Sequence, residues 1–371
     1  MFSDVIKSLP ISDWVSESLF VTKSTVENCL RKDHFGIEDL AILISPAAES
    51  YIETIAQKSA AITKQRFGNI IQVFIPMYLS NECFNTCTYC GFSMEHKYER
   101  RTLNNKEICA DADVLYKKGF QHILLLTGES PKKVGVDYIA NAVKLLTDKF
   151  PSIGIEVQPL QEVEYEKLIK AGASSLTLYQ ETYHHDSYLK YHLFGIKRQY
   201  DKRLDALEAG AKAGFHTINM GTLSGLYDWR YDSIALAHHV DYMMKHYWKA
   251  KYAVSFPRIN DMVGDFDIKY PTTDIALVQM ICAFRLIFPD IIITLSTRES
   301  AALRDSIIPL GVTQISAESK TSPGAYSEVK AEKQFEIEDQ RSLGEIKKVL
   351  HNKGYETVMK DWDYSLNTLK N

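Results

Sequence analysis

The sequence predicts a closed α/β barrel of eight parallel strands, of the TIM type, with an N-terminal helical extension and a C-terminal helix and tail. First, 371 residues are enough for one large barrel with flanking helices. Second, from residue 71 onward short apolar, β-branched runs alternate with longer helical stretches about eight times. Third, polar residues follow each apolar run, as they do at the C-terminal face of a barrel. An open, doubly wound sheet is the alternative.

The segment before residue 71 predicts amphipathic helices and shows no residue pattern with evident chemistry. Pro10–Asp13 and Gly36–Leu40 are typical of helix starts. The predicted strands then follow in chain order: Ile71–Leu79, His122–Leu126, Gly154–Val157, Ser175–Tyr179, Thr217–Met220, Tyr252–Ser255, Ile291–Leu295 and Thr313–Ser316.

Several of the intervening helices are marked by a glycine just beyond their last turn, where a left-handed residue ends a helix. The predicted helices and their glycines are Asn105–Lys118 with Gly119, Val163–Ala171 with Gly172, and Arg203–Ala213 with Gly214. We therefore divide the chain into an extension (1–70), a barrel (71–320) and a C-terminal part (321–371). That last part contains a loop, a helix from about Leu343 to His351, and an aromatic, charged tail, Met359–Tyr364, expected to pack over a barrel end.

The composition is that of a globular protein, with 45% hydrophobic and 24% charged residues. A net charge of −4 with dispersed Lys and Arg gives no electrostatic case for nucleic acid. The N-terminus carries Asp4, Asp13 and Glu17, which does not fit a signal peptide, and no apolar run approaches the roughly 18 residues of a membrane span. Six cysteines in a chain of this length are not a disulfide framework, so we expect a cytoplasmic protein.

The most informative motif is the C-x3-C-x2-C spacing of Cys83, Cys87 and Cys90, directly after the first predicted strand. Three thiolates within eight residues can hold three irons of a [4Fe–4S] cluster and leave the fourth iron open for chemistry. The alternatives are three buried thiols or a zinc site that recruits His96, although structural zinc prefers paired C-x2-C motifs.

The cysteine spacing resembles that of radical S-adenosylmethionine (SAM) enzymes, in which the open iron chelates SAM. Longer runs are similar to the 2-iminoacetate synthase family, the tyrosine lyases of thiamine thiazole biosynthesis. The matching runs are Tyr78–Asn81, Cys83–Ser93, Glu156–Leu160, Tyr179–Tyr183, Val254–Arg258, Ile281–Leu286, Leu295–Glu299 and Lys360–Asp363.

This resemblance implies cleavage of the Cα–Cβ bond of L-tyrosine to 2-iminoacetate and 4-cresol, with SAM split to methionine and 5′-deoxyadenosine. It implies that Tyr89 lies near the adenine of SAM, that Glu129 meets the amino group, and that Glu181 meets the ribose. Arg203 is placed to pair with the SAM carboxylate, because arginine suits a carboxylate. Thr127 departs from the family's Gly-Gly-Glu segment, which leaves the backbone contacts to SAM open.

Arg298 is the candidate for the carboxylate of tyrosine, because a guanidinium after an apolar strand needs an anionic partner. Glu299 next to it is the alternative partner. Ser319, together with Ser316 and Arg258, is expected to line the substrate pocket. The pairs His184–His185 and His238–His239 are interpreted as surface or interface residues, because adjacent side chains point apart.

The resemblance also implies partners: thiazole synthase to receive the product, and a reducing protein such as flavodoxin or ferredoxin. Rival functions are the tyrosine lyase of hydrogenase maturation and a deazaflavin-type synthase. The first has a second C-terminal cysteine cluster, whereas this sequence has no cysteine after Cys282. A zinc-stabilised scaffold is the non-enzyme alternative.

Overall fold

The structure, a computed structural model, describes residues 1–259, 266–327 and 330–359. Eight parallel strands form its centre, and they close because β10 pairs with β1. The open-sheet alternative is therefore wrong. The barrel strands are β1 (Ile70–Ser80), β3 (His122–Thr127), β4 (Ser152–Glu156), β5 (Ser175–Thr177), β7 (Thr217–Gly221), β8 (Lys251–Ser255), β9 (Ile292–Leu295) and β10 (Gln314–Ser316).

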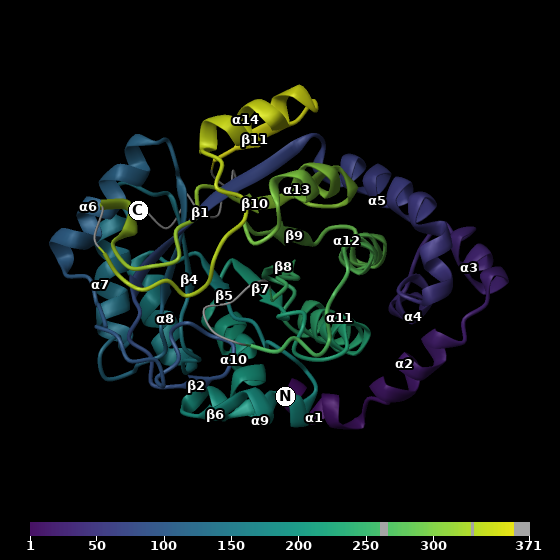
Figure 1. Cartoon of the computed structure of the whole chain (residues 1–371), viewed down its shortest axis with the longest axis horizontal. Helices are drawn as coiled ribbons and strands as arrows, with labels where there is room; N and C mark the ends of the chain where they lie inside the picture. The colour runs from purple at the N-terminus through teal and green to yellow at the C-terminus, as the bar shows by residue number, and fades with distance from the viewer. Residues whose placement is uncertain (260–265, 328–329, 360–371) are drawn as a thin grey trace.

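A ring of helices surrounds the strands (Figure 1). These helices are α6 (Asn105–Lys117), α7 (Val136–Leu146), α8 (Glu162–Ala171), α10 (Tyr200–Ala213), α11 (Trp229–His246), α12 (Asp274–Ile287) and α13 (Ala301–Ile307). The glycines predicted to end three helices, Gly119, Gly172 and Gly214, all have positive φ angles, of 91°, 117° and 100°. The helix ends could be predicted because this backbone conformation favours glycine.

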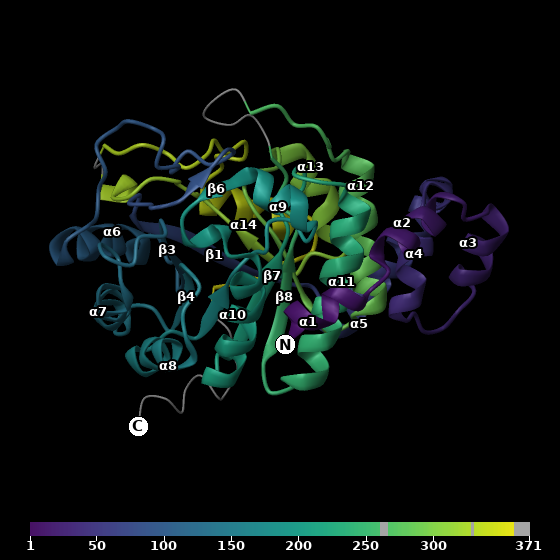
Figure 2. The same cartoon turned by 90° about the horizontal axis from the view of Figure 1, so that it is seen from below.

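The N-terminal helices lie along one side of the barrel. They are α1 (Phe2–Val5), α2 (Ile11–Leu19), α3 (Lys23–Leu30), α4 (Leu40–Leu43) and α5 (Ile52–Phe67). The helix α5 packs on α12, whereas α2, α3 and α4 extend beyond the ring in both views (Figures 1 and 2). The first turn is anchored because the amide of Phe2 donates to the Glu208 carboxylate on α10 at 2.7 Å.

Three short strands were missed by the sequence patterns. β2 (Thr86–Cys87) pairs with β6 (His192–Phe194), and β11 (Glu356–Val358) adds beside residues 70–72 at the start of β1. Each is two or three residues long, too short for an alternating pattern to reveal. The segment from 192 to 198, which contains β6 and a 3₁₀ turn (Ile196–Arg198), follows α9 (His185–Tyr191) and brings distant residues to the loop that contains the three cysteines.

The strand ends differ from the predicted bounds at β5, which ends at Thr177 and not at Tyr179. Backbone hydrogen bonds nevertheless continue beyond it, from Leu178 to Asn219 at 3.0 Å and from Gln180 to Gly221 at 3.1 Å. The predicted C-terminal helix is α14 (Leu343–Asn352). The predicted tail contact and the run Lys360–Asp363 lie outside the described residues.

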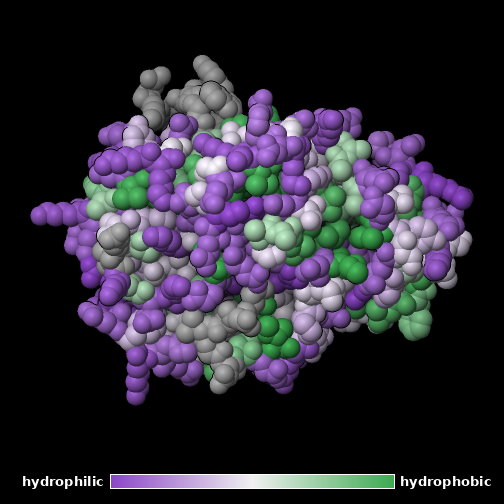
Figure 3. All heavy atoms as spheres, turned by 45° about the horizontal axis from the view of Figure 1, so that its top comes forward, coloured by the Kyte–Doolittle hydropathy of each residue, from purple (hydrophilic) through white to green (hydrophobic). Residues whose placement is uncertain are grey.

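The carboxyl ends of the strands meet beneath a layer of loops, at the front of Figure 1 and the top of Figure 2. These loops include residues 81–93, called the cysteine loop from here on, and the segments 318–327 and 330–342 between β10 and α14. Within the described residues, no helix has the length and apolarity needed to cross a membrane. The face in Figure 3 is mostly hydrophilic, with separate hydrophobic groups.

Candidate active site

The cysteine loop leaves β1 at the C-terminal face of the barrel. Cys83, Cys87 and Cys90 are all free thiols, and Cys87 pairs with His192 in the β2–β6 ladder. Burial raises the pKa of Cys83 to about 11, so this thiol needs the positive charge of bound iron to ionise readily. Among the described residues, no three His, Cys, Asp or Glu side chains gather around one ion. The three thiols suit a cluster, since there each binds a separate iron.

Arg100 holds the two ends of the cysteine loop together, and the sequence patterns did not reveal it. Its guanidinium donates to the carbonyl oxygens of Asn81 and Phe92 at 2.8 Å and of Ser93 at 2.6 Å. It also stacks 4.2 Å from the centre of the Tyr98 ring. Only the contacts formed after folding identify this arginine, because nothing in its spacing distinguishes it from an exposed one.

Gly128 allows the loop after β3 to approach the cysteine loop closely. A Cβ at this position would lie 2.8 Å from the carbonyl carbon of Glu82 and 3.1 Å from the Cβ of Cys83. The two loops are joined by a hydrogen bond from the Phe84 amide to the Glu129 carbonyl, at 2.9 Å. Gly128 therefore brings the Glu129 side chain beside the cysteines.

Next to the cysteines, four charged side chains and one amide form a connected network. Arg203 on α10 pairs with Glu129 at 2.8 Å and with Glu181 at 3.6 Å. Lys197 pairs with Glu181 at 2.6 Å, and Asn85 donates to Glu129 at 2.8 Å. The structure thus brings together the three residues expected to meet the amino, carboxylate and ribose groups of SAM, and adds Lys197 and Asn85.

The network favours the charged forms of Glu129 and Lys197 although both are largely buried. Burial alone would raise the pKa of Glu129, yet the charges of Arg203 and Lys197 hold this pKa below its usual value. Burial works to lower the pKa of Lys197, but Glu181 raises it well above the normal range. The carboxylates and cations are therefore matched in charge before any ligand arrives.

Two further features lie at the edge of this network. The backbone of Glu181 has a φ of 71°, a left-handed conformation that residues other than glycine rarely adopt. Tyr89 is buried, and its hydroxyl is 2.8 Å from Nε2 of His192. Lys197 lies 5.8 Å from the centre of the Tyr89 ring. Tyr89 and Glu181 both line the central cavity, where they were expected to contact SAM.

The central cavity has a volume of about 140 Å³ and lies inside the C-terminal mouth of the barrel. Cys90, Tyr89, Glu181 and Lys197 line one side of it, and Arg298 and Ser319 line it as well. The cavity therefore connects the cysteine loop to the residues predicted to bind tyrosine.

Arg298 follows β9 and lies 3.4 Å from the centre of the Phe335 ring. Burial lowers its pKa, although Tyr78 and Glu181 act in the opposite direction. The neighbouring Glu299 pairs with Arg258, whose Nε lies 3.0 Å from it. Glu299, the alternative partner considered for Arg298, is thus occupied by a different arginine.

The serines and Arg258 have different surroundings. Ser319 is buried, and its hydroxyl has no hydrogen-bond partner among the described residues. Ser316 accepts a hydrogen bond from the Thr297 amide at 3.1 Å, so its hydroxyl is already engaged. Arg258 was expected to line the pocket, but it is not part of the cavity wall and is bound to Glu299 and Asp274. That expectation was wrong because the side chain turns toward α12.

Glu156 ends β4 and faces the cavity, where it is partly exposed. Burial raises its pKa to about 7, and the negative charge of Glu181 adds to this effect. Lys197, Arg203 and Arg298 act in the opposite direction. The sequence patterns placed Glu156 at the correct edge of the sheet but gave it no role.

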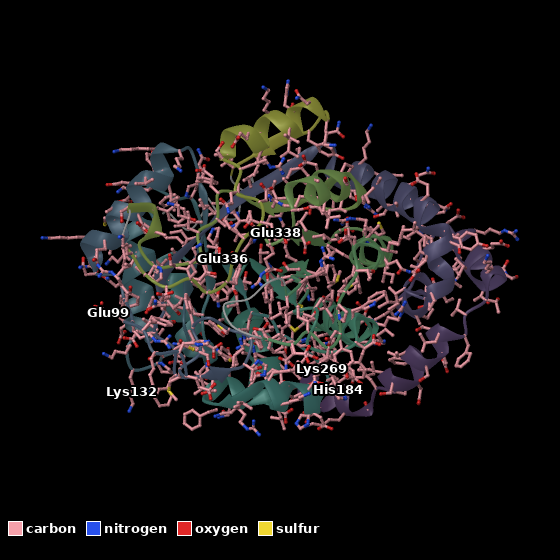
Figure 4. All side chains as sticks on the ribbon, viewed as in Figure 1. Glu99, Lys132, His184, Lys269, Glu336 and Glu338 are labelled. Carbon is pink, nitrogen blue, oxygen red and sulfur yellow. The ribbon has the colours of Figure 1, made fainter. Side chains whose placement is uncertain are left out.

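The segment 330–339 covers the cysteine loop and the cavity. Gln334 accepts a hydrogen bond from Tyr78 at 2.7 Å and donates to the sulfur of Cys90 at 3.7 Å. The Gly91 amide donates to the Gln334 carbonyl at 3.1 Å. Figure 4 shows Glu336 and Glu338 on this segment in front of the strands, whereas Lys132 and His184 lie toward the lower part of the view.

The members of the two histidine pairs lie in different surroundings. His184 caps α9 through Ser187, and His238 stacks on Trp14 at 4.7 Å. His239 is fully buried, stacks on Phe2 at 4.0 Å and lies 2.8 Å from the Tyr183 hydroxyl. The prediction of a surface or interface position is wrong for His239, because α11 turns this residue into the core.

Comparison with known proteins agrees with this geometry. Residues 77–237 match the radical SAM superfamily, and residues 255–356 match the biotin and thiamin synthesis associated domain. The 2-iminoacetate synthase of Escherichia coli strain K12 is 41% identical, over 98% of this chain and 97% of that protein. The chain belongs to the 2-iminoacetate synthase family. The Salmonella typhimurium enzyme of the same name is 43% identical, over 92% of this chain and 91% of that protein.

A solved structure described as HydG, a maturase of the [FeFe]-hydrogenase, has a TM-score of 0.92 at 28% identity. It covers 98% of this chain and 82% of that one. Methylornithine synthase shares the fold, with a TM-score of 0.72 at 20% identity over 90% of this chain and 97% of that one. As a member of this radical SAM family, the chain is a carbon–carbon lyase that uses a [4Fe–4S] cluster and SAM. The zinc scaffold is therefore excluded.

Proposed function

We propose that this chain cleaves the Cα–Cβ bond of L-tyrosine to 2-iminoacetate and 4-cresol, and so supplies the thiazole of thiamine. The observation that carries the proposal is a loop with three free cysteines at the mouth of a closed barrel, in a chain that matches 2-iminoacetate synthases along nearly its whole length. When bound, the cluster and SAM supply the radical that abstracts hydrogen from the substrate.

The chain's own residues bind and orient the reactants. Cys83, Cys87 and Cys90 hold the cluster. Glu129 accepts hydrogen bonds from the SAM ammonium, which suits a carboxylate. Glu181 binds the ribose hydroxyls, and the ring of Tyr89 lies beside the adenine. These roles are supported by the position of Tyr89 and Glu181 beside Cys90 on the cavity wall, and by Arg203, which pairs with both Glu129 and Glu181.

Arg203 already pairs with Glu129 and Glu181. Its N–H groups that are not used in these pairs donate to the SAM carboxylate. Arg298 binds the carboxylate of tyrosine, and the unpartnered hydroxyl of Ser319 hydrogen-bonds to the substrate. The segment 330–339 excludes water and oxygen from the cavity that it covers. We also retain, as a proposal, the division into extension (1–70), barrel (71–320) and C-terminal part (321–371).

Two protein partners complete the proposal. Thiazole synthase receives 2-iminoacetate directly, because the imine hydrolyses in water. A reducing protein such as flavodoxin or ferredoxin supplies the electron. The exposed rings of Phe84 and Phe194 lie 5.8 Å apart beside the cysteine loop, and Lys132, Lys133 and Lys202 line a neighbouring groove. An acidic redox protein suits this combination of apolar and basic groups.

The deciding experiment is anaerobic turnover with L-tyrosine, SAM and a reductant, followed by product identification. We expect free 4-cresol, one equivalent of 5′-deoxyadenosine, and glyoxylate from hydrolysed 2-iminoacetate. Retention of the cresol fragment in a larger product would indicate a synthase of the deazaflavin type. Carbon monoxide or cyanide would indicate the reaction of hydrogenase maturation.

A further inference from the structure

The carboxylates that line the central cavity differ in whether a cation of the protein is paired with them. They are Glu156, Glu181 and Glu299. Glu181 is paired with Lys197 and Arg203, and Glu299 is paired with Arg258. Among the described residues, the side chain of Glu156 makes no hydrogen bond and no ion pair. It is thus the cavity carboxylate without a cationic partner.

A carboxylate below the protein surface is expensive to keep ionised unless a cation or hydrogen-bond donor meets it. Glu156 stands at the end of β4, where an uncharged side chain would be easier to accommodate. Perturbed groups of this kind in a cleft are candidates for ligand binding or catalysis. The missing partner is then expected on the ligand.

Glu156 and Arg298 give the cavity one negative and one positive side chain that can bind the charged groups of an amino acid. Arg298 supplies a cation for an α-carboxylate, and it is near enough to Glu156 for each charge to shift the pKa of the other. An L-amino acid in water is a zwitterion, so its second charged group is an ammonium. We propose that Glu156 binds the α-ammonium group of the substrate and accepts its proton, which leaves the amine neutral. This inference rests on the proposed function and adds a residue to it.

The proton moves from the α-ammonium group of the substrate to the carboxylate of Glu156, and no other reactant is needed. One N–H bond of the ammonium breaks, its electron pair stays on nitrogen, and the proton forms an O–H bond on Glu156. Removal of a hydrogen atom from a neutral amine leaves a neutral nitrogen radical, whereas removal from an ammonium leaves a radical cation at higher energy. A carboxyl group with a pKa of about 7 can accept this proton near neutral pH, whereas an ordinary carboxylate is a weaker base.

The titratable and charged groups that act on Glu156 come from several elements. They are Tyr78, Tyr179, Glu181, Lys197, Arg203 and Arg298. The cations among them outnumber the one other carboxylate, yet none lies within ion-pair distance of Glu156. The site is therefore receptive to a ligand cation placed directly against the carboxylate.

Equilibrium binding tests this assignment without turnover. SAM-loaded protein, without reductant, is titrated with L-tyrosine, with 3-(4-hydroxyphenyl)propionate, which lacks the amine, and with tyramine, which lacks the carboxylate. The variants are Glu156→Gln, which keeps the shape but not the charge, and Arg298→Lys. SAM affinity serves as the test of an intact fold for each variant.

We expect Glu156→Gln to weaken L-tyrosine and tyramine by about 10- to 100-fold and to leave the propionate within about 3-fold. Arg298→Lys should show the opposite pattern, weakening L-tyrosine and the propionate but not tyramine. Wild-type affinity for L-tyrosine should fall below about pH 7, and Glu156→Gln should remove this dependence.

The proposal is overturned if Glu156→Gln leaves L-tyrosine binding unchanged, or weakens the propionate as much as L-tyrosine. If Glu156→Gln does not retain SAM, Glu156→Asp replaces it, and this variant should keep the preference for amine-bearing ligands at lower affinity; loss of that preference also overturns the proposal. A wild-type protein that binds none of the three ligands would instead contradict the proposed function.

Discussion

The charged residues at the central cavity form two groups that differ in whether they are paired with one another. On the side of the cysteine loop, Glu129, Arg203, Glu181 and Lys197 are already paired with one another. Two other charged residues of the cavity wall are outside this network. Glu156, at the end of β4, has no side-chain partner among the described residues, and Arg298, which follows β9 across the barrel, lies against the Phe335 ring. The first group is preorganised for a cofactor, since its charged side chains need little rearrangement. The second is receptive to a substrate that brings its own charges.

The largest effect is expected from the loss of one cysteine that holds the cluster. Cys87→Ala removes one of the three thiolates proposed to hold the cluster, so the cluster should not assemble and formation of 4-cresol should fall by more than about 1,000-fold. Iron analysis and product quantification measure this. Cys109→Ala, a half-buried thiol on α6, is the control and should retain the iron. A fully loaded, SAM-cleaving Cys87→Ala protein would contradict the ligand assignment.

A second substitution tests whether the paired group is a single unit. Arg203→Ala leaves Glu129 and Glu181 without their shared cation, and removal of one partner from a buried pair destabilises by about 3–5 kcal/mol. Urea unfolding of the cluster-free protein measures the loss, and SAM affinity should fall as well. Lys202→Ala, an exposed neighbour on α10, should change the free energy of unfolding by less than about 0.5 kcal/mol. Equal effects of the two variants would argue against the network.

A third substitution tests the role of Arg298 during turnover. Arg298→Lys retains the charge but loses the two-pronged geometry that a carboxylate prefers. We expect the KM for tyrosine to rise by about 10- to 100-fold and that for SAM by less than about 3-fold. Steady-state kinetics under anaerobic conditions give both constants. A similar rise in both would place Arg298 with the cofactor-binding group.

The smallest expected effect is on the free energy of unfolding, and it tests whether the side chain of Glu156 lacks a partner in the folded protein. The pKa of Glu156 is raised to about 7 in the folded protein, above an ordinary value near 4.5. Folding therefore loses stability as the pH rises from about 4.5 through 7, where the unfolded chain ionises this group more readily. Glu156→Gln should raise the free energy of unfolding by about 1–3 kcal/mol at pH 8 and leave it nearly unchanged at pH 4.5. Urea titrations at the two pH values measure this; a variant destabilised at pH 8 would show that the carboxylate is satisfied in the folded state.

The sequence predicted the closed barrel and the edge at which the site lies, because alternating βα units and the polar residues after each strand are local patterns. It predicted the role of the cysteine loop from the spacing of the three cysteines, and the three residues Glu129, Glu181 and Arg203 with the help of family resemblance. It did not predict Lys197 or Asn85, which reach the site because β6 pairs with β2, a contact between segments about 100 residues apart.

Arginines show the same limit. Sequence position alone does not separate Arg298, which lines the cavity, from Arg258, which binds Glu299 and Asp274, or from Arg100, which holds the cysteine loop. Arg258 and Arg298 each follow the end of a strand, whereas Arg100 lies in the loop between the cysteines and α6. Their roles depend on which carbonyls and carboxylates the folded chain places around each guanidinium, and this is decided by tertiary packing.

The most direct test of the central claim is metal analysis and EPR spectroscopy of anaerobically reconstituted protein, before and after addition of SAM. Three cysteines that leave one iron open predict about four irons and four sulfides per chain, and a reduced-cluster signal that shifts when SAM is added. Zinc in place of iron, or a cluster signal that SAM leaves unchanged, would contradict the account.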